Sequence, residues 1–226
     1  MAMQGMLHIG SVVKEGCLRG LAWVMGGGLL WVARMATGVR PLWQGTVPRP
    51  VQRVYFANHG SHGDFVMIWA CLPPAQRRAT RPVAGQDYWL ASGLRHFVAS
   101  RVFRALLINR HPQPGEPSPV DQMAQTLADG DSLIIFPEGT RRPVGAPPDY
   151  KYGVAHLYKT LGLPCQPVAL NSGMFWSRKS FIRRPGTVLV ESLDPIQPGL
   201  SPTEFAETLE AEIETATNRL IAESRA

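Results

Sequence analysis

The sequence predicts an α/β fold, in which helices flank a mixed central sheet and an N-terminal hydrophobic, membrane-associating helical motif comes first. Short apolar runs typical of buried strands alternate with longer runs whose apolar residues recur at helical spacing. The chain has 226 residues, enough for one domain with a substantial core. We therefore expect an N-terminal helical segment at residues 1–45 and a main domain at residues 46–226.

The N-terminal segment is apolar but short. Residues 20–33 carry no charge and lie between Arg19 and Arg34. A helix that spans a membrane needs about 20 apolar residues, and we expect Gly26-Gly27-Gly28 to interrupt this run. The pattern favours two short helical pieces that enter one leaflet. A buried hydrophobic helix is the alternative, and a single membrane span is less favoured.

The flanks of this segment fit an interfacial position. Aromatic rings prefer the headgroup level of a bilayer, and basic side chains reach toward lipid phosphates. We expect this arrangement for the tryptophans and cations of the segment: Trp23, Trp31, Trp43, Lys14, Arg19, Arg34 and Arg40.

The remaining elements follow in chain order. Strands are expected at residues 51–57, 79–84, 105–109, 132–136, 166–170 and 187–191. Helices are expected at residues 65–72, 121–128 and 150–161, with loops at 111–120 and 143–149.

The final helix has a readable start. Ser201 is placed as N-cap, Pro202 at the first helical position and Glu204 at the third, which is a capping box. Apolar residues then recur at helical spacing and predict its packing stripe: Phe205, Leu209, Ile213 and Leu220.

Residues 86–104 have apolar positions at near-helical spacing, with Arg95, Arg101 and Arg104 between them. A basic amphipathic helix of this kind can lie on an acidic membrane surface. A helix that packs on the core and exposes a basic side is the alternative, and the sequence does not separate the two.

The charge distribution indicates an anionic partner. The net charge is +6, and the residues from Ser201 onward contain six Glu against two Arg, so the first 200 residues carry about +10. A positive charge of this size suits binding to an acidic membrane face or to a phosphorylated substrate. The chain lacks an interleaved aromatic and basic RNA-binding signature, so no nucleic acid is expected.

The three cysteines, Cys17, Cys71 and Cys165, are scattered without a CxxC pair or a His/Cys cluster. This spacing favours a reducing compartment and predicts no disulfide and no metal site.

A histidine and an aspartate stand between the first confident strand and the next helix, in the run Asn58-His59-Gly60-Ser61-His62-Gly63-Asp64. If Asp64 accepts the Nδ1–H of His59, the Nε2 of His59 is left to take a proton, as a general base requires. Residues five apart on a regular helix point away from each other, so His59 must lie in a loop that folds back over Asp64. The alternative is that Asp64 only caps the helix and His59 is an ordinary loop residue.

A second motif, Phe136-Pro137-Glu138-Gly139-Thr140-Arg141, follows the strand expected at 132–136. Ligands gather at the C-terminal ends of strands in open α/β sheets. Together the two motifs resemble the glycerolipid acyltransferase family, the 1-acyl-sn-glycerol-3-phosphate (lysophosphatidic acid) acyltransferases. Two further motifs match in part: Arg104 to Arg110, where Ile108 and Arg110 agree, and Gln166 to Gly173, where a Pro-Val pair agrees.

The resemblance implies an acyltransferase domain at residues 46–226. It implies transfer of a fatty acyl group from an acyl-carrier-protein or coenzyme A thioester to the free hydroxyl of 1-acylglycerol-3-phosphate, giving phosphatidate. The alcohol attacks the thioester directly, without a covalent acyl-enzyme or a cofactor. His59 and Asp64 are the expected catalytic residues. The expected substrate-binding residues are Arg110, Glu138, Gly139, Thr140, Arg141 and Lys151.

Roles for the second set follow from chemistry. Guanidinium groups match phosphate oxygens two at a time, so Arg110 and Arg141 are expected to face one pocket and hold the acceptor's phosphate. Glu138 is expected to hold the polar part of the acceptor or to orient Arg141. The Gly139 N–H is a candidate donor to an oxyanion or a phosphate.

Two other functions remain open from the sequence alone: acylation of another lysolipid, and a membrane lipid-binding module without turnover. The expected location is the cytoplasmic face of the inner (plasma) membrane.

Overall fold

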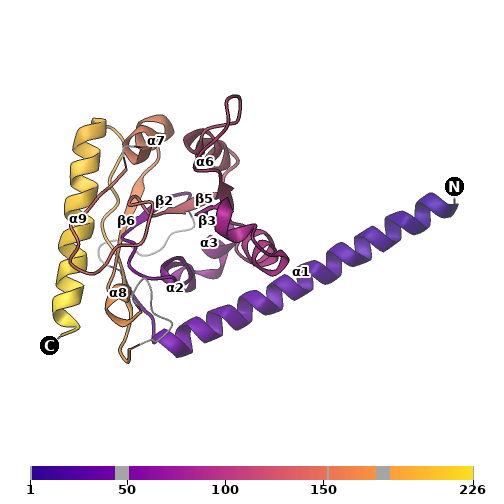
Figure 1. Ribbon diagram of the computed structural model, residues 1–226, viewed down its shortest axis with the longest axis horizontal. Coiled ribbons are helices and arrows are strands. Elements are labelled where there is room, and N and C mark those ends of the chain that lie inside the picture. Colours follow the sequence, from indigo (N-terminus) through magenta and orange to yellow (C-terminus); the bar gives the residue numbers. More distant parts are fainter. Residues whose placement is uncertain (1, 44–50, 152, 177–183, 226) are drawn as a thin grey trace.

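A mixed seven-stranded sheet forms the centre of the part of the chain that the structure describes, as predicted (Figure 1). The computed structural model describes residues 2–43, 51–151, 153–176 and 184–225. The strand order is β1-β7-β6-β2-β5-β3-β4, and only β6 and β7 pair antiparallel among these neighbours. The strands are β1 (Arg40–Trp43), β2 (Val54–Ala57), β3 (Thr80–Gly85), β4 (Leu106–Ile108), β5 (Ser132–Ile135), β6 (Cys165–Leu170) and β7 (Leu189–Ser192).

Helices cover both faces of this sheet. Those N-terminal to β4 are α1 (Ala2–Thr37), α2 (Asp64–Cys71), α3 (Pro74–Ala79), α4 (Gln86–Trp89), α5 (Gly93–Phe97) and the π-helix η1 (Val98–Val102). Those that follow are α6 (Pro119–Ala128), α7 (Gly153–Leu161), α8 (Ser172–Phe175) and α9 (Pro202–Glu223).

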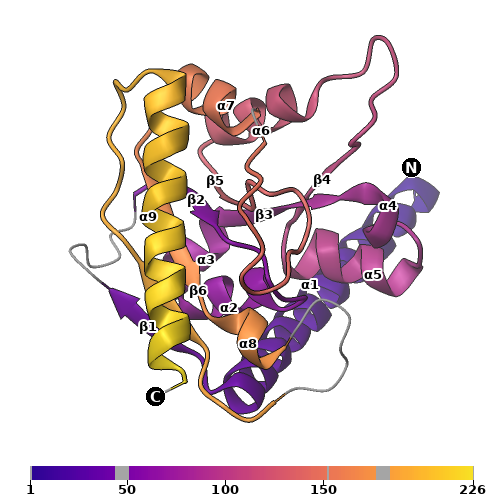
Figure 2. The ribbon, with the colours of Figure 1, turned by 60° about the vertical axis from the view of Figure 1, so that its left-hand side comes forward.

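Strand β2 shows how the sheet divides the core. Val54 and Phe56 pack with residues of α6, α7 and α9, whereas Tyr55 and Ala57 pack with residues of α2. Successive side chains of a strand point to opposite faces, and all four are buried because both faces are covered. Figures 1 and 2 show α9 running alongside β6, on the opposite side of the sheet from α2.

The prediction for the last helix is confirmed. The Glu204 N–H donates to Ser201 Oγ at 3.2 Å, and the Ser201 N–H donates to Glu204 Oε2 at 2.9 Å. The predicted stripe is fully buried, with Phe205, Leu209, Ile213 and Leu220 each 0% exposed. Phe205 contacts Phe56 and stacks on Tyr158, so the helix is anchored on the sheet.

The expected interruption of the first helix at Gly26-Gly27-Gly28 is wrong, because α1 is one continuous helix of 36 residues. A glycine costs only about 1 kcal/mol relative to alanine within a helix, which tertiary contacts can offset. A methyl group at Gly26 would lie 3.4 Å from Val102 of η1 and 3.8 Å from Trp69 of α2. Gly26 thus allows close packing of α1 on the rest of the fold.

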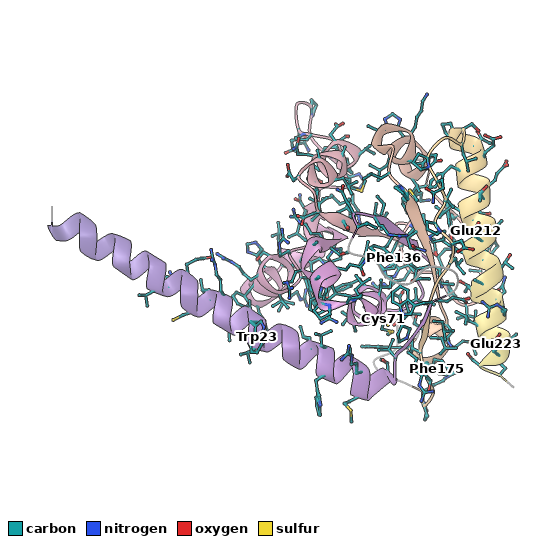
Figure 3. The ribbon with its side chains drawn as sticks, turned by 180° about the vertical axis from the view of Figure 1, so that it is seen from behind. Trp23, Cys71, Phe136, Phe175, Glu212 and Glu223 are labelled. Atoms are coloured by element: carbon teal, nitrogen blue, oxygen red, sulfur yellow. The ribbon has the colours of Figure 1, made fainter. Side chains whose placement is uncertain are left out.

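The flanking residues of α1 divide into two groups. Trp23 and Trp31 are 81% and 65% exposed, as an interfacial position requires, and Figure 3 shows Trp23 well apart from the sheet around Phe136. Arg34 instead donates to the Ala70 carbonyl oxygen at 3.1 Å, and Trp43 packs against the core between the sheet and α2. Arg34 is nonetheless exposed, and the position of Arg34 toward headgroups and of Trp43 near the interface stays a prediction.

The segment Val13–Thr37 of α1 is long and apolar enough to cross a membrane, and little of it is buried within the fold. Strand β1 follows directly and pairs with β7, so residues 40–43 belong to the sheet. The division of the chain at residue 45 stays a prediction.

Residues 86–104 do not form a single helix, which corrects the sequence-based expectation. The segment divides into α4, α5 and η1, and Arg104 has a φ of +50° just before β4. Leu90 and Leu94 are 51% and 68% exposed, whereas Ala99 and Phe103 are buried. Within residues 86–104, the C-terminal half therefore packs against the core, whereas the N-terminal half leaves its leucines exposed.

Candidate active site

His59 and Asp64 form the pair that their spacing predicts. His59 lies in the loop after β2, and Asp64 is the first residue of α2. The His59 Nδ1 is 2.8 Å from Asp64 Oδ2. The Asp64 carboxylate is fully buried, whereas the His59 side chain is 19% exposed. This geometry assigns the Nδ1 proton to the hydrogen bond and leaves Nε2 as the acceptor.

Backbone and side-chain donors hold the Asp64 carboxylate in place. Its Oδ2 also accepts from the N–H groups of Gly60 and Ser61, at 2.9 and 2.8 Å. Its other oxygen, Oδ1, accepts from the Ser172 hydroxyl at 2.5 Å. Asp64 therefore folds the loop back over the start of α2, and the alternative of a simple helix cap does not describe its contacts.

The His59 ring and backbone are fixed by the second motif. The ring stacks on Phe136, with centroids 4.1 Å apart. The His59 N–H donates to Glu138 Oε1 at 3.0 Å, and the His59 carbonyl accepts from the Arg142 N–H at 2.8 Å. Strands β2 and β5 pair in parallel, so the two motifs that follow them lie side by side at the C-terminal ends of the strands.

Asn58 ties the same loop to the next strand. Its side-chain amide donates to the Leu170 carbonyl at 2.9 Å and accepts from the Leu170 N–H at 2.8 Å. This pair of bonds joins the C-terminal ends of β2 and β6. It also brings Ser172, which follows β6, to Asp64.

Glu138 has a buried, incompletely partnered carboxyl group. The residue is 4% exposed, and its Oε2 accepts no hydrogen bond from any residue that the structure describes. Burial raises the pKa of Glu138 to about 7, although the His59 N–H bond acts in the opposite direction. Glu138 supports the His59 backbone, and no hydrogen bond or ion pair between Glu138 and Arg141 is found among the described residues.

Gly139 and Thr140 are exposed at the turn that follows. Gly139 has a φ of +65°, which favours glycine, and its N–H donates to the Phe136 carbonyl at 3.0 Å. This N–H therefore closes the turn, so it is not available to an oxyanion in this conformation.

The predicted phosphate-binding cations lie on one flank of His59. Arg141 reaches back to the preceding motif, and its Nη1 lies 2.7 Å from His62 Nε2. Arg110 follows β4 and lies across the end of β3, where a methyl group on Gly85 would be 2.9 Å from Arg110 Nε. Since β3 separates β4 from β5, both arginines lie along the same C-terminal edge of the sheet. Lys151 is exposed and pairs with Asp149 at 2.7 Å.

A cavity of about 390 Å³ lies on the other flank of His59. Its walls are the ends of β2 and β6, the loop at residues 143–148 and one side of α9. Neither Arg110 nor Arg141 lines it, whereas Glu138 and Arg142 do. The expectation that both arginines face one pocket is therefore not met by this cavity.

Sequence reasoning missed several contributors to the site. Arg142 lies just outside the matched motif, which ends at Arg141. Helix α9 begins some sixty residues further on, so no short sequence pattern connects it with the site. Ser172 had none either, because its contact with Asp64 depends on which strands are neighbours. Among the described residues, no group of three or more His, Cys, Asp or Glu could hold a metal ion.

Comparisons with known proteins agree with this geometry. A family model described as Acyltransferase matches residues 44–171, more than half of the chain. The chain belongs to the acyltransferase family. The match spans both motifs and ends at Asn171, so Ser172 and α9 lie beyond it.

Individual relatives share this assignment. The chain is 26% identical over 164 residues to a 1-acyl-sn-glycerol-3-phosphate acyltransferase of Pseudomonas aeruginosa, which covers 71% of this chain and 61% of that protein. It is 31% identical over 186 residues to 1-acyl-sn-glycerol-3-phosphate acyltransferase alpha of Mus musculus, covering 78% of this chain and 62% of that protein. The chain thus spans about three fifths of the length of these relatives.

A solved structure has the same fold. The crystal structure of the 1-acyl-sn-glycerophosphate (LPA) acyltransferase from Thermotoga maritima superposes with a TM-score of 0.70 at 18% identity. The superposition covers 92% of this chain and 82% of that chain. The acyltransferase fold therefore extends well beyond residues 44–171 of this chain.

Proposed function

We propose that this acyltransferase moves a fatty acyl group from an acyl thioester to the free hydroxyl of 1-acylglycerol-3-phosphate and so forms phosphatidate. One observation carries the proposal: a partly exposed imidazole is held at 2.8 Å by a fully buried carboxylate. The pair lies at the carboxyl edge of a sheet, beside guanidinium groups suited to a phosphate. The names of the relatives support the same acceptor.

The reaction follows from the orientation of His59. The acceptor hydroxyl oxygen attacks the thioester carbonyl carbon while Nε2 takes the hydroxyl proton. A carbon–oxygen bond forms, the carbon–sulfur bond breaks, and the proton passes to the leaving thiolate. Asp64 stabilises the transient imidazolium and keeps its ring in place. The chain needs no cofactor in this scheme, since the thioester is a co-substrate.

The phosphate of the acceptor is assigned to the flank that holds Arg141 and Arg110. A phosphate there would exchange the contact between Arg141 and His62 for charge-assisted hydrogen bonds. Lys151 adds a third cation nearby on the chain. Acylation of another lysolipid, such as a lyso-aminolipid, is the second candidate, and an acceptor without a phosphate would not require these cations.

The donor and the location are further parts of the proposal. Either acyl-carrier-protein or coenzyme A thioesters satisfy the chemistry at His59. The exposed tryptophans of α1 support association with a membrane surface. We propose that this surface is the cytoplasmic face of the inner (plasma) membrane.

An acyl-transfer assay tests the function. Purified protein is mixed with 1-acylglycerol-3-phosphate and either thioester, and released thiol and phosphatidate are quantified together. We expect equal amounts of both products. Thiol release without phosphatidate would show hydrolysis, and no thiol release with any lysophosphatidate would reject the proposal.

A further inference from the structure

An apolar surface is exposed where α4 and α5 meet. Tyr88, Leu90 and Leu94 are 53%, 51% and 68% exposed, and residues 88–94 contain no charged side chain. Single exposed apolar residues are common on folded proteins, but several in one short segment mark a contact with an apolar partner. We call residues 88–96 the α4–α5 segment.

The backbone of the α4–α5 segment is fixed, so the exposure of its leucines is built into the fold. The Ser92 hydroxyl caps α5 by accepting from the Arg95 N–H at 3.3 Å. The Trp89 ring packs edge-on against Phe65, which follows Asp64 in α2, with the ring centroids 6.1 Å apart. Trp89 thus anchors the segment on the fold, while the leucines remain at the surface.

The charges beside these leucines are positive. Arg95 and His96 follow them directly, and the Arg95 Cζ lies 4.5 Å from the centre of the Tyr88 ring. Arg95 is exposed and forms no ion pair with any residue that the structure describes, whereas Arg101 pairs with Glu15. Apolar and aromatic side chains with a cation at their border are typical of segments that lie in the interface of an anionic membrane.

The α4–α5 segment lies beside α1. Helix α5 continues directly into η1, and η1 packs on α1, where a methyl group on Gly26 would be 3.4 Å from Val102. The ion pair between Glu15 and Arg101 joins the same two helices. Figure 2 shows α4 and α5 next to the N-terminal part of α1. The exposed leucines therefore lie close to the helix assigned to the membrane.

We propose that the α4–α5 segment is a second membrane contact, with Leu90 and Leu94 inserted among the acyl chains of an anionic bilayer and Arg95 at its headgroups. A single helix in an interface leaves the protein free to turn about the helix axis, and a second contact away from that axis prevents the turn. Gly85 ends β3 just before α4, and Arg110 lies across it, so the segment adjoins the edge assigned to the acceptor's phosphate. The contact holds that edge at the membrane that carries the acceptor, and this part of the inference rests on the proposed function.

A bilayer fits the α4–α5 segment better than a protein partner does. Because the surface is small, a symmetric contact with a second copy would bring Arg95 and His96 of one copy close to the same cations of the other. An acidic acyl carrier protein would suit these cations, but the uncharged run 88–94 offers it no further salt bridges. The interior of a bilayer needs no such partner for the leucines.

Paired substitutions test the insertion. Leu90→Ser combined with Leu94→Ser removes the apolar side chains. The matched control combines Val51→Ser, which precedes β2, with Leu200→Ser, which precedes α9; these residues are 48% and 39% exposed. Binding to vesicles of phosphatidylcholine and phosphatidylglycerol is measured by co-sedimentation. We expect the leucine pair to weaken binding about tenfold and the control pair to leave it unchanged. Equal binding by the two paired variants would reject the contact.

A charge substitution tests the lipid class. One basic residue near an anionic surface strengthens binding about fivefold, so Arg95→Gln should lose that factor on vesicles that contain phosphatidylglycerol. On pure phosphatidylcholine Arg95→Gln should bind like the wild-type protein. Arg225→Gln, at an exposed site near the C-terminus, is the control. An equal loss on both kinds of vesicle, or no loss on either, would refute the placement of Arg95 at anionic headgroups.

A fluorescent label reports insertion without turnover. Nitrobenzoxadiazole is attached to Leu94→Cys in a protein that carries Cys17→Ser and Cys71→Ser, with Leu200→Cys as control; Cys165 is buried. We expect vesicles to shift the emission of the label at residue 94 to shorter wavelength and to leave the label at residue 200 unchanged. A response at residue 94 to acyl carrier protein or to unlabelled protein, with none to vesicles, would overturn the proposal in favour of a protein partner.

Activity separates this inference from the proposed function. We expect the leucine pair to acylate a short-chain, water-soluble 1-acylglycerol-3-phosphate as fast as the wild-type protein does, and an acceptor held in vesicles about tenfold more slowly. Equal losses with both acceptors would contradict a role at the membrane. Absence of acyl transfer by the wild-type protein would reject the proposed function, while the vesicle and label measurements would still decide whether the segment inserts.

Discussion

The Ser172 hydroxyl donates a 2.5 Å hydrogen bond to Asp64 Oδ1, and both residues are fully buried. Asp64 thereby has donors on both oxygens: Ser172 on one, and His59 with two backbone N–H groups on the other. The bond joins α8, which follows β6, to the first residue of α2. Ser172 positions Asp64 and so acts on His59 without touching the substrate.

Replacement of Ser172 by alanine should lower kcat about tenfold and leave both KM values within twofold. Loss of a bond to a buried carboxylate costs about 1–3 kcal/mol, and part of that cost falls on the orientation of the imidazole. Ser132→Ala is the control, because Ser132 is also buried but lies at the N-terminal start of β5. Equal kcat losses in the two variants would mean that Ser172 is only structural.

Removal of the base should have a much larger effect. General-base catalysis contributes about 10²–10⁴-fold, so His59→Ala should lose that factor in kcat and Asp64→Asn a comparable one. Vesicle binding by His59→Ala should equal that of the wild-type protein. Unchanged turnover of the His59→Ala variant would refute the assigned base.

Glu138 should make stability depend on pH. Its folded pKa of about 7 lies above the ordinary value of 4.5, so the stability it contributes is full below pH 4.5 and lost as pH rises through 7. The wild-type protein should therefore lose up to about 3 kcal/mol relative to Glu138→Gln between pH 4.5 and 8. Denaturant unfolding at both pH values measures this difference. Glu207→Gln, at an exposed site on α9, is the matched control.

Arg141 should recognise the phosphate of the acceptor. Arg141→Ala should raise the KM for 1-acylglycerol-3-phosphate about 10- to 100-fold, as expected for a lost hydrogen bond between charged groups. A monoacylglycerol, which lacks the phosphate, should show no such change. Arg225→Ala, an exposed cation near the C-terminus, is the control. An equal loss with both acceptors would exclude phosphate recognition by Arg141.

The exposed tryptophans of α1 should drive membrane association. Replacing Trp23 and Trp31 by serine should weaken binding to anionic vesicles about tenfold for each residue, because each ring buries a large apolar area at the interface. Co-sedimentation with vesicles measures the partition. Leu200→Ser, another exposed apolar residue, should have no effect. Binding that survives the double substitution would place the contact elsewhere on the molecule.

Much of the fold and half of the site followed from local patterns in the sequence. The pairing of His59 with Asp64 was predictable because five residues of loop leave few ways to arrange them. The capping box and stripe of α9 were predictable for the same reason, since each depends on neighbours within a few turns. The break at Gly26–Gly28 was wrong because the packing of α1 on α2 and η1 offsets the low helix propensity of glycine.

The sequence by itself determined the catalytic pair, the strand ends that carry both motifs and the net positive charge of the first 200 residues. Only the tertiary structure decided that Ser172, 108 residues from Asp64, holds the carboxylate, and that α9 closes a cavity away from Arg110 and Arg141. The physical reason is the order of the strands. Which loops meet depends on which strands are neighbours, and the non-local packing energy of the whole sheet sets that order.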